Sequence, residues 1–95
     1  MAETEKKAYR WVISGRVQGV GFRYFARQAA ESLRLTGWVR NCADGSVEVQ
    51  VAGTPETLQR FRRELERGPR SALVEEIVAE HLDQAPRWQS FSIAV

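Results

Sequence analysis

The sequence predicts an α+β domain in which two helices cover one face of an antiparallel sheet. Apolar residues alternate with polar ones in residues 8–14, 47–52 and 88–95, as in half-buried strands. Two other segments, from Phe22 and from Pro55, carry apolar residues at helical spacing. We expect residues 1–95 to form one domain, because this length supports one two-layer core.

The first strand and the first helix are predicted from periodicity. In residues 8–14, Tyr9, Trp11 and Ile13 share one face, and Gly15 ends the strand. The polar and charged residues 1–7 before it are expected to be a flexible N-terminus. The helix then runs from about Phe22 to about Arg34. Its apolar positions are Phe25, Ala26, Ala29, Ala30 and Leu33.

A hairpin follows the first helix. Trp38–Arg40 is a short extended segment that brings the chain to Asn41. The pair Asp44-Gly45 is a strong turn signal between two extended runs. The strand at 47–52 places Val47, Val49 and Val51 toward the core, opposite Glu48 and Gln50.

The second helix has clear start and stop signals. Thr54 is the expected N-cap and Pro55 the first helical residue, while Gly68-Pro69 stops the helix. Its buried stripe is Leu58, Phe61 and Leu65. Residues 72–82 are extended, and residues 88–95 add a short last strand.

The order strand, helix, strand, strand, helix, strand is that of the ferredoxin-like sandwich. Its right-handed crossovers bring the end of the first strand, the start of the first helix and the end of the second strand to the same edge of the sheet. We therefore expect Arg23 and Asn41 to meet there, although they are distant in sequence.

The segment 15–23, Gly-Arg-Val-Gln-Gly-Val-Gly-Phe-Arg, is predicted to bind a phosphate. Its glycines let the backbone curl tightly and turn N–H groups inward. A helix that begins directly after this loop adds its unpaired first-turn N–H groups and the positive end of its dipole. Arg23, in that first turn, can bind two phosphate oxygens at once. The alternative is a glycine-rich turn with a structural role alone.

Two common phosphate loops are excluded by spacing. A Walker-type loop ends in Gly-Lys-Ser/Thr, and this stretch contains no lysine. The dinucleotide fingerprint needs a third glycine where Tyr24 stands.

Three segments together resemble the acylphosphatase family. They are residues 15–23, Gly37-Trp38-Val39-Arg40-Asn41 and Asp44-Gly45-Ser46-Val47-Glu48, and the likeness covers nearly the whole chain. The resemblance implies hydrolysis of acyl phosphates to a carboxylate and inorganic phosphate by in-line attack of water, without a metal or other cofactor. Position 21 varies in the family, so Gly21 is expected to add flexibility only.

The resemblance also implies roles for particular residues. Arg23 would bind the phosphate and Asn41 would orient the attacking water. The cradle would be completed by backbone amides of the loop, namely Gln18, Gly19, Val20, Gly21, Phe22 and Arg23.

The chemistry of these residues also favours acyl phosphates as substrates. Asn41 offers one acceptor and two donors but cannot remove a proton. A site with no obvious acid cannot help an alkoxide to leave, whereas a carboxylate leaves unaided because its conjugate acid has a pKa of about 4. Acyl phosphates meet this restriction.

Composition narrows the choice of partners. The net charge is +2 and the pI about 9.1, but the basic residues are dispersed, so no nucleic-acid partner is expected. No apolar run is long enough to cross a bilayer, and residues 1–7 are unlike a secretory signal. We expect a cytoplasmic monomer with a small-molecule acyl phosphate as its partner.

Other interpretations of the sequence stay open at this point. The strand order is shared by RNA-recognition domains, although the strand at 47–52 lacks the aromatic residues that such domains use. A regulatory domain could bind phosphoanions without turnover, and a relic of a larger carbamoyl- or acyl-phosphate enzyme is a third alternative. Asn41 could serve only as a turn residue. Cys42 is expected to be buried or half-buried, and His81 to be a surface residue.

Overall fold

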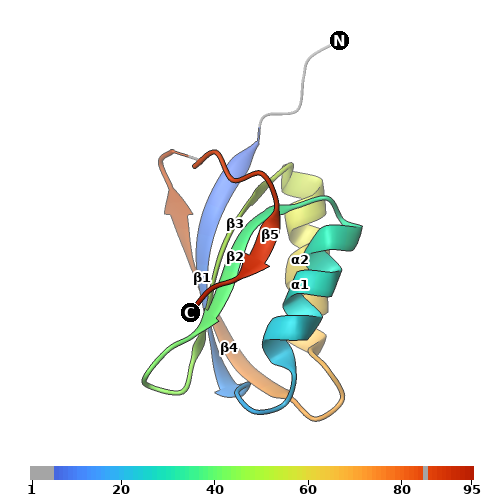
Figure 1. Ribbon diagram of the computed structural model, residues 1–95, viewed down its shortest axis with the longest axis vertical. Coiled ribbons are helices and arrows are strands. Elements are labelled where there is room, and N and C mark those ends of the chain that lie inside the picture. The colour runs from blue at the N-terminus through green and yellow to red at the C-terminus, as the bar shows by residue number, and fades with distance from the viewer. Residues whose placement is uncertain (1–5, 85) are drawn as a thin grey trace.

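A computed structural model describes residues 6–84 and 86–95. Within these residues the chain forms two helices and five strands, which Figure 1 shows as a sheet with both helices on one side. In chain order the elements are β1 (Lys7–Arg16), α1 (Phe22–Ser32), β2 (Thr36–Asn41), β3 (Val47–Gly53), α2 (Pro55–Arg67), β4 (Leu73–Leu82) and β5 (Phe91–Ile93). The predicted ferredoxin-like α+β fold is confirmed.

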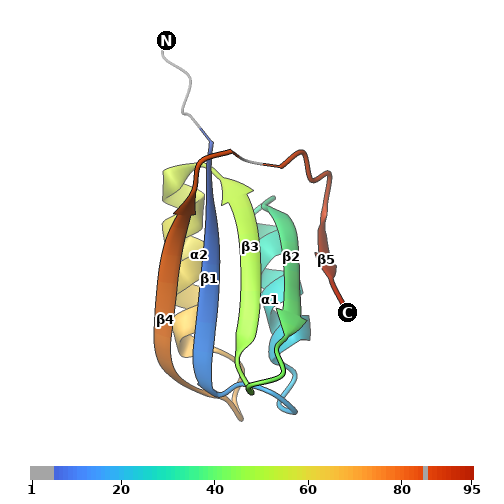
Figure 2. The same cartoon turned by 90° about the vertical axis from the view of Figure 1, so that its left-hand side faces the viewer.

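The five strands lie in the order β4-β1-β3-β2-β5 (Figure 2). The four long strands pair antiparallel, as the sequence predicted. The short last strand is also present, but it pairs parallel to β2, with Ile93 beside Val39. The sheet is therefore mixed rather than wholly antiparallel.

Several element boundaries differ from the predicted ones for local reasons. β1 continues to Arg16, because a bulge between Ser14 and Gly15 shifts the register and lets the strand keep pairing with β4. α1 ends at Ser32 rather than near Arg34, whose φ of 59° lies in the left-handed region. Of the segment expected to be flexible, Lys7 pairs with Gly53, and residues 1–5 lie outside the described residues.

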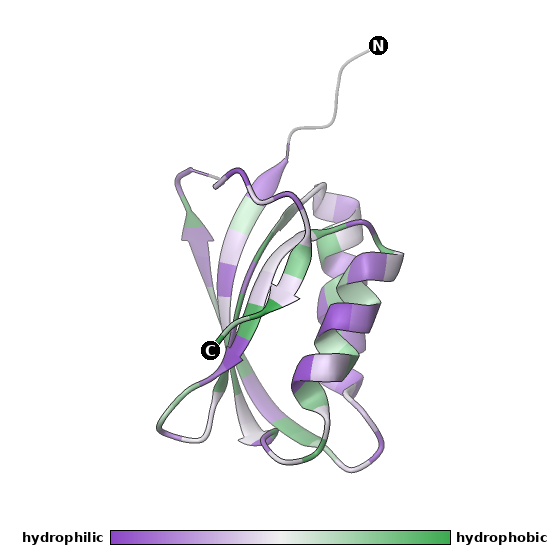
Figure 3. Ribbon diagram, in the orientation of Figure 1, coloured by the Kyte–Doolittle hydropathy of each residue, from purple (hydrophilic) through white to green (hydrophobic). Residues whose placement is uncertain are grey.

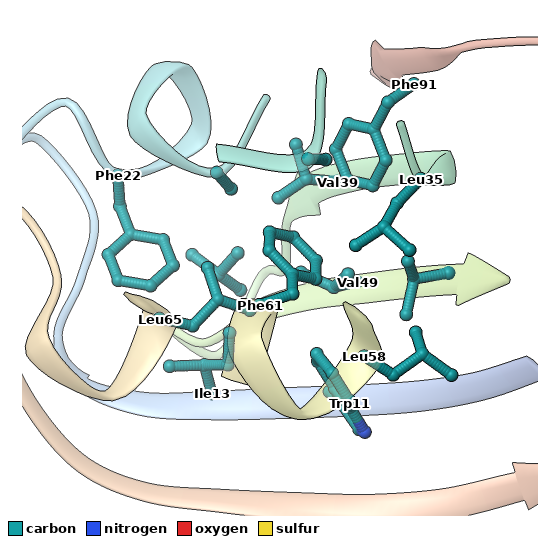
Figure 4. Close-up of a cluster of buried hydrophobic side chains, with 14 of the residues drawn as sticks. Trp11, Ile13, Phe22, Leu35, Val39, Val49, Leu58, Phe61, Leu65 and Phe91 are labelled. Atoms are coloured by element: carbon teal, nitrogen blue, oxygen red, sulfur yellow. The ribbon is translucent and has the colours of Figure 1, made fainter. Parts of the chain in front are cut away.

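The core lies between the helices and the sheet and is centred on Phe61 of α2 (Figure 4). The Phe61 ring lies 5.7 Å from the Trp11 ring and 5.8 Å from the Phe91 ring, measured between centroids. Phe61, Leu58 and Leu65 are all buried, which confirms the predicted stripe of α2. Burial of each such side chain stabilises the fold by about 1.5–3 kcal/mol. Colouring by hydropathy shows polar and apolar residues interspersed along α1, the helix nearer the viewer (Figure 3).

The sheet face away from the helices carries an ion cluster in which a buried carboxylate pairs with two partly exposed arginines. Glu48 of β3 lies opposite the core face, as predicted, yet it is only 3% exposed. Its carboxylate accepts hydrogen bonds from Arg10 Nε at 2.6 Å and Arg40 Nε at 2.8 Å. Burial raises the pKa of the Glu48 carboxyl, but the hydrogen bonds from Arg10, Arg40 and Gln50 outweigh that effect and lower the pKa below its ordinary value. The cluster thus links three neighbouring strands.

No helix in the part of the chain that the structure describes has the length and apolar character needed to cross a membrane.

Candidate active site

The loop between β1 and α1 takes its shape from two glycines with positive φ. Gly19 has a φ of 75°, and Gly21 has a φ of 79°. Other residues adopt this left-handed conformation only at a cost in strain. Gly21 is the N-cap residue of α1, so it sets how the chain enters the helix and does more than add flexibility. Val17, which is buried, holds the loop to the core.

The N-terminus of α1 has the properties of an anion site. No side chain caps it, and its first turn contains no acidic residue. The first-turn N–H groups are therefore free to donate hydrogen bonds to a ligand, and the positive end of the helix dipole adds to the attraction for an anion. Arg23 lies in this turn and is exposed, and its side chain forms no hydrogen bond or ion pair with any residue in 6–84 or 86–95. The α1 N-terminus and Arg23 thus place positive charge at a cavity whose lining residues include no carboxylate.

A cavity of about 380 Å³ opens at this end of the sheet. It is lined by Val17, Gly19, Gly21, Phe22, Arg23, Tyr24, Asn41 and Ile93. Arg23 and Asn41 border the same cavity, as their placement in the fold predicted. Arg23 is the only charged residue among these lining residues. Of the predicted loop residues, Gln18 and Val20 do not border the cavity, and their backbone contacts with a phosphate stay a prediction.

Asn41 is the last residue of β2 and pairs with Val47 of β3. Strand alternation places it on the same face as Val39, which is fully buried in the core beneath the helices. Its Oδ1 atom is buried and accepts no hydrogen bond from the described residues. An acceptor in this position is ready to bind a donor that enters the cavity, since a buried oxygen without a partner costs free energy.

The side chain of Gln18 has a role that the sequence did not indicate. Its Nε2 donates to the carbonyl oxygens of Cys42 and Ser46, both at 2.8 Å. The phosphate loop is thereby tied to the β2–β3 hairpin that carries Asn41. Asp44 accepts hydrogen bonds from the Ser46 hydroxyl and backbone N–H, which lower the pKa of Asp44 and order the turn.

Tyr24 and Ile93 are cavity residues that sequence reasoning missed. Tyr24 directly follows Arg23 in the first turn of α1, and this adjacency was an available signal. Ile93 reaches the cavity only because β5 pairs parallel to β2, which no local pattern predicts.

The remaining candidates take the positions expected of them. Cys42 is half-buried and free, and His81 is exposed, with its ring edge-on to Tyr9 at 5.2 Å between centroids. Within residues 6–84 and 86–95, no three His, Cys, Asp or Glu side chains gather in a way that could hold a metal ion.

Comparisons with known proteins agree on one family. A family model described as acylphosphatase matches residues 9–93. An acylphosphatase of Bacillus licheniformis is 41% identical over 86 residues, which cover 90% of this chain and 96% of that protein. The crystal structure of acylphosphatase from Bacillus subtilis matches with a TM-score of 0.91 at 37% identity, over 94% of this chain and 99% of that one.

A larger protein contains a similar fold. Full-length HypF, in a phosphate- and nucleotide-bound form, matches with a TM-score of 0.85 at 26% identity, over 96% of this chain and 12% of HypF. The family model spans most of the sequence, and the two Bacillus acylphosphatases match over nearly their whole length. The chain therefore belongs to the acylphosphatase family.

Proposed function

We propose that the protein hydrolyses acyl phosphates to a carboxylate and inorganic phosphate by direct in-line attack of water on phosphorus, with no metal and no covalent intermediate. One observation carries the proposal. A single cavity is bordered by the glycine loop, by the unpaired cation of Arg23 and by Asn41, whose buried Oδ1 has no partner among the described residues.

The phosphoryl group is held by the loop and by Arg23. Backbone N–H groups at the start of α1 donate to its oxygens, and the guanidinium makes two parallel hydrogen bonds. As the bond to the leaving group lengthens, charge builds on the three equatorial oxygens. These donors are already in place and stabilise that charge in the transition state.

Asn41 orients the attacking water. Its buried Oδ1 accepts a hydrogen bond from the water, which keeps the oxygen lone pair directed at phosphorus. An amide cannot take the proton, so the proton passes to a non-bridging oxygen of the phosphate itself. The products are a carboxylate and a protonated inorganic phosphate, and the atoms balance without a further reactant.

The lining of the cavity restricts the leaving group. None of the lining residues is an aspartate, a glutamate or a histidine. An alkoxide leaving group would need protonation, whereas a carboxylate leaves as the anion because its conjugate acid has a pKa of about 4. The site therefore suits mixed carboxylic-phosphoric anhydrides and disfavours ordinary phosphate monoesters.

We also propose that the protein acts in the cytoplasm as a monomer on a small molecule, with no nucleic-acid partner. Light scattering after gel filtration is expected to give a mass near 10.8 kDa. A dimer mass would contradict this part of the proposal.

Hydrolysis of benzoyl phosphate, followed by its ultraviolet absorbance with excess chelator present, tests the function. p-Nitrophenyl phosphate serves as the matched substrate with a phenolate leaving group. Rapid turnover of benzoyl phosphate alone is the expected result. If neither substrate is turned over while inorganic phosphate still raises the unfolding temperature, the protein is a phosphoanion-binding domain and the proposal is wrong.

A further inference from the structure

We infer that Tyr24 and Ile93 form a subsite for the acyl group, which makes the enzyme select acyl phosphates whose acyl group is apolar and planar, such as an aromatic one. This inference rests on the proposed function and deepens it. The phosphate loop and Arg23 recognise the phosphoryl group, which all acyl phosphates share. Any selectivity between acyl phosphates must therefore come from the rest of the cavity wall.

Tyr24 is an exposed aromatic side chain at the site. It is 59% exposed, and the large apolar side chains exposed elsewhere in the described residues, Leu73, Val78 and Val95, do not line the cavity. The Arg27 guanidinium lies over the ring, 5.0 Å from its centroid, and holds it by a cation–π contact. With one face taken by Arg27, the opposite face and the ring edge remain for a ligand.

Ile93 supplies a second apolar contact from another element. It is half-buried, packs against the core and pairs with Val39 of β2, so its side chain lies on the helix-covered face of the sheet. Asn41 follows on the same face of β2, two residues beyond Val39. The parallel pairing of β5 therefore brings an apolar side chain next to the position proposed for the attacking water.

The covalent structure of the substrate brings its acyl group to these residues. Arg23 and Tyr24 line the same cavity, so a phosphate that Arg23 binds there shares the cavity with the Tyr24 ring. The acyl carbon is joined to the phosphate through one bridging oxygen. The cavity of about 380 Å³ is larger than a phosphate group needs, and its remaining wall is apolar. A planar apolar acyl group is the chemistry that this wall can bind.

Such contacts act on substrate choice. The apolar part of the acyl group changes little between the bound substrate and the transition state. Its contacts with Tyr24 and Ile93 therefore lower KM with little effect on kcat. Acetyl phosphate has only a methyl group to place there, so its KM depends much less on the Tyr24 ring.

The test compares kcat and KM for benzoyl phosphate and acetyl phosphate in the wild type, Tyr24→Ala, Tyr24→Phe and Ile93→Ala. Leu73→Ala is the matched control, because Leu73 is 61% exposed and lies outside the cavity. Tyr24→Ala is expected to lower the benzoyl-to-acetyl ratio of kcat/KM by about tenfold through KM. Tyr24→Phe keeps the ring and is expected to retain this ratio. Ile93→Ala is expected to lower the ratio by less than Tyr24→Ala does. Leu73→Ala is expected to leave kcat and KM for both substrates unchanged.

Each contrary outcome has a definite meaning. Equal loss of both substrates in Tyr24→Ala, or an unchanged ratio, overturns the acyl subsite while the proposed function stands. Loss of the ratio in Tyr24→Phe assigns recognition to the hydroxyl group and overturns a contact with the ring. A wild type that hydrolyses neither substrate overturns the proposed function, and the acyl subsite with it.

Discussion

Arg23 is a charged residue in an electrostatically unfavourable position. A cation in the first turn of a helix is repelled by the dipole unless an anion binds beside it. Arg23 has no carboxylate partner among the residues that the structure describes. Its position fits the proposed role in phosphate binding, and its contribution to stability without ligand should be small.

Arg23→Lys is expected to lower kcat/KM for benzoyl phosphate by about 10²–10³-fold, because an ammonium cannot make the two parallel hydrogen bonds of a guanidinium. The inhibition constant of inorganic phosphate should rise as well. Steady-state kinetics with phosphate as a competitive inhibitor measure both effects. Arg70→Lys is the control at an exposed position outside the cavity. Near-normal kinetics of Arg23→Lys would remove the guanidinium from phosphate binding.

Asn41 should act on turnover and hardly on binding. Asn41→Ala is expected to lower kcat by about 10²-fold, since the water loses the acceptor that orients it. The inhibition constant of inorganic phosphate should stay within about twofold, because the loop and Arg23 are intact. The free energy of unfolding should also change little, since the buried Oδ1 has no partner to lose among the described residues. An unchanged kcat would leave Asn41 with the role of a turn residue only.

At the scale of elements, the proposed active site depends on the contact between the 17–21 loop and the β2–β3 hairpin. Gln18 makes this contact with two hydrogen bonds from one amide nitrogen to the carbonyl oxygens of Cys42 and Ser46. The brace sets where the loop lies relative to Asn41 at the end of β2. Such a device is invisible in the sequence, because it depends on two segments that meet only in the folded chain.

Gln18→Ala is expected to destabilise the fold by about 1–3 kcal/mol, because two hydrogen bonds are lost, while the carbonyl oxygens of Cys42 and Ser46 keep their backbone donors. KM for benzoyl phosphate should rise as the loop loosens. Gln18→Glu is nearly isosteric and should be the worse variant, since a carboxylate would face two carbonyl oxygens. Urea unfolding and steady-state kinetics of both variants measure these effects. If Gln18→Glu is as stable as the wild type, the amide does not brace the loop.

Features that depend on residues close together in the chain were predicted correctly from the sequence. The Phe61 stripe, the Thr54 cap and the Asp44-Gly45 turn all follow from neighbours in the chain. The meeting of Arg23 and Asn41 followed from the handedness of the crossovers. The parallel pairing of β5 and the cavity contact of Ile93 could not be predicted, because a three-residue strand carries no signal for its direction or partner.

At the scale of the whole molecule, the two faces of the sheet have different chemistry. One face packs against the helices and forms the core, while the other carries the Glu48 cluster with Arg10 and Arg40. The cluster joins β1, β3 and β2, the strands that carry the loop and Asn41. Because the lowered pKa of Glu48 lies below its unfolded value, the cluster makes stability depend on pH.

The pH dependence has a definite sign. The contribution of Glu48 is fully present above its unfolded pKa of about 4.3 and is lost as the pH falls through its lower folded pKa. Glu48→Gln is expected to cost about 1–3 kcal/mol at pH 7, allowing for solvent contact of both arginines, and less below pH 4. Urea unfolding from pH 3 to 7 measures the free energy of unfolding of the wild type and the variant, with Glu76→Gln as the control at an exposed carboxylate outside the cluster. A constant difference across that range would exclude Glu48 as the titrating group.

Hydrolysis of benzoyl phosphate in water enriched in oxygen-18 tests the central claim most directly, because it shows which atom the water attacks. Attack on phosphorus cleaves the bond between phosphorus and the bridging oxygen. All of the label incorporated from water should then be in the inorganic phosphate, with none in the benzoate, as measured by mass spectrometry of both products. Label in the benzoate would show attack on the carbonyl carbon. That result would contradict a site in which the loop, Arg23 and Asn41 act on the phosphoryl group.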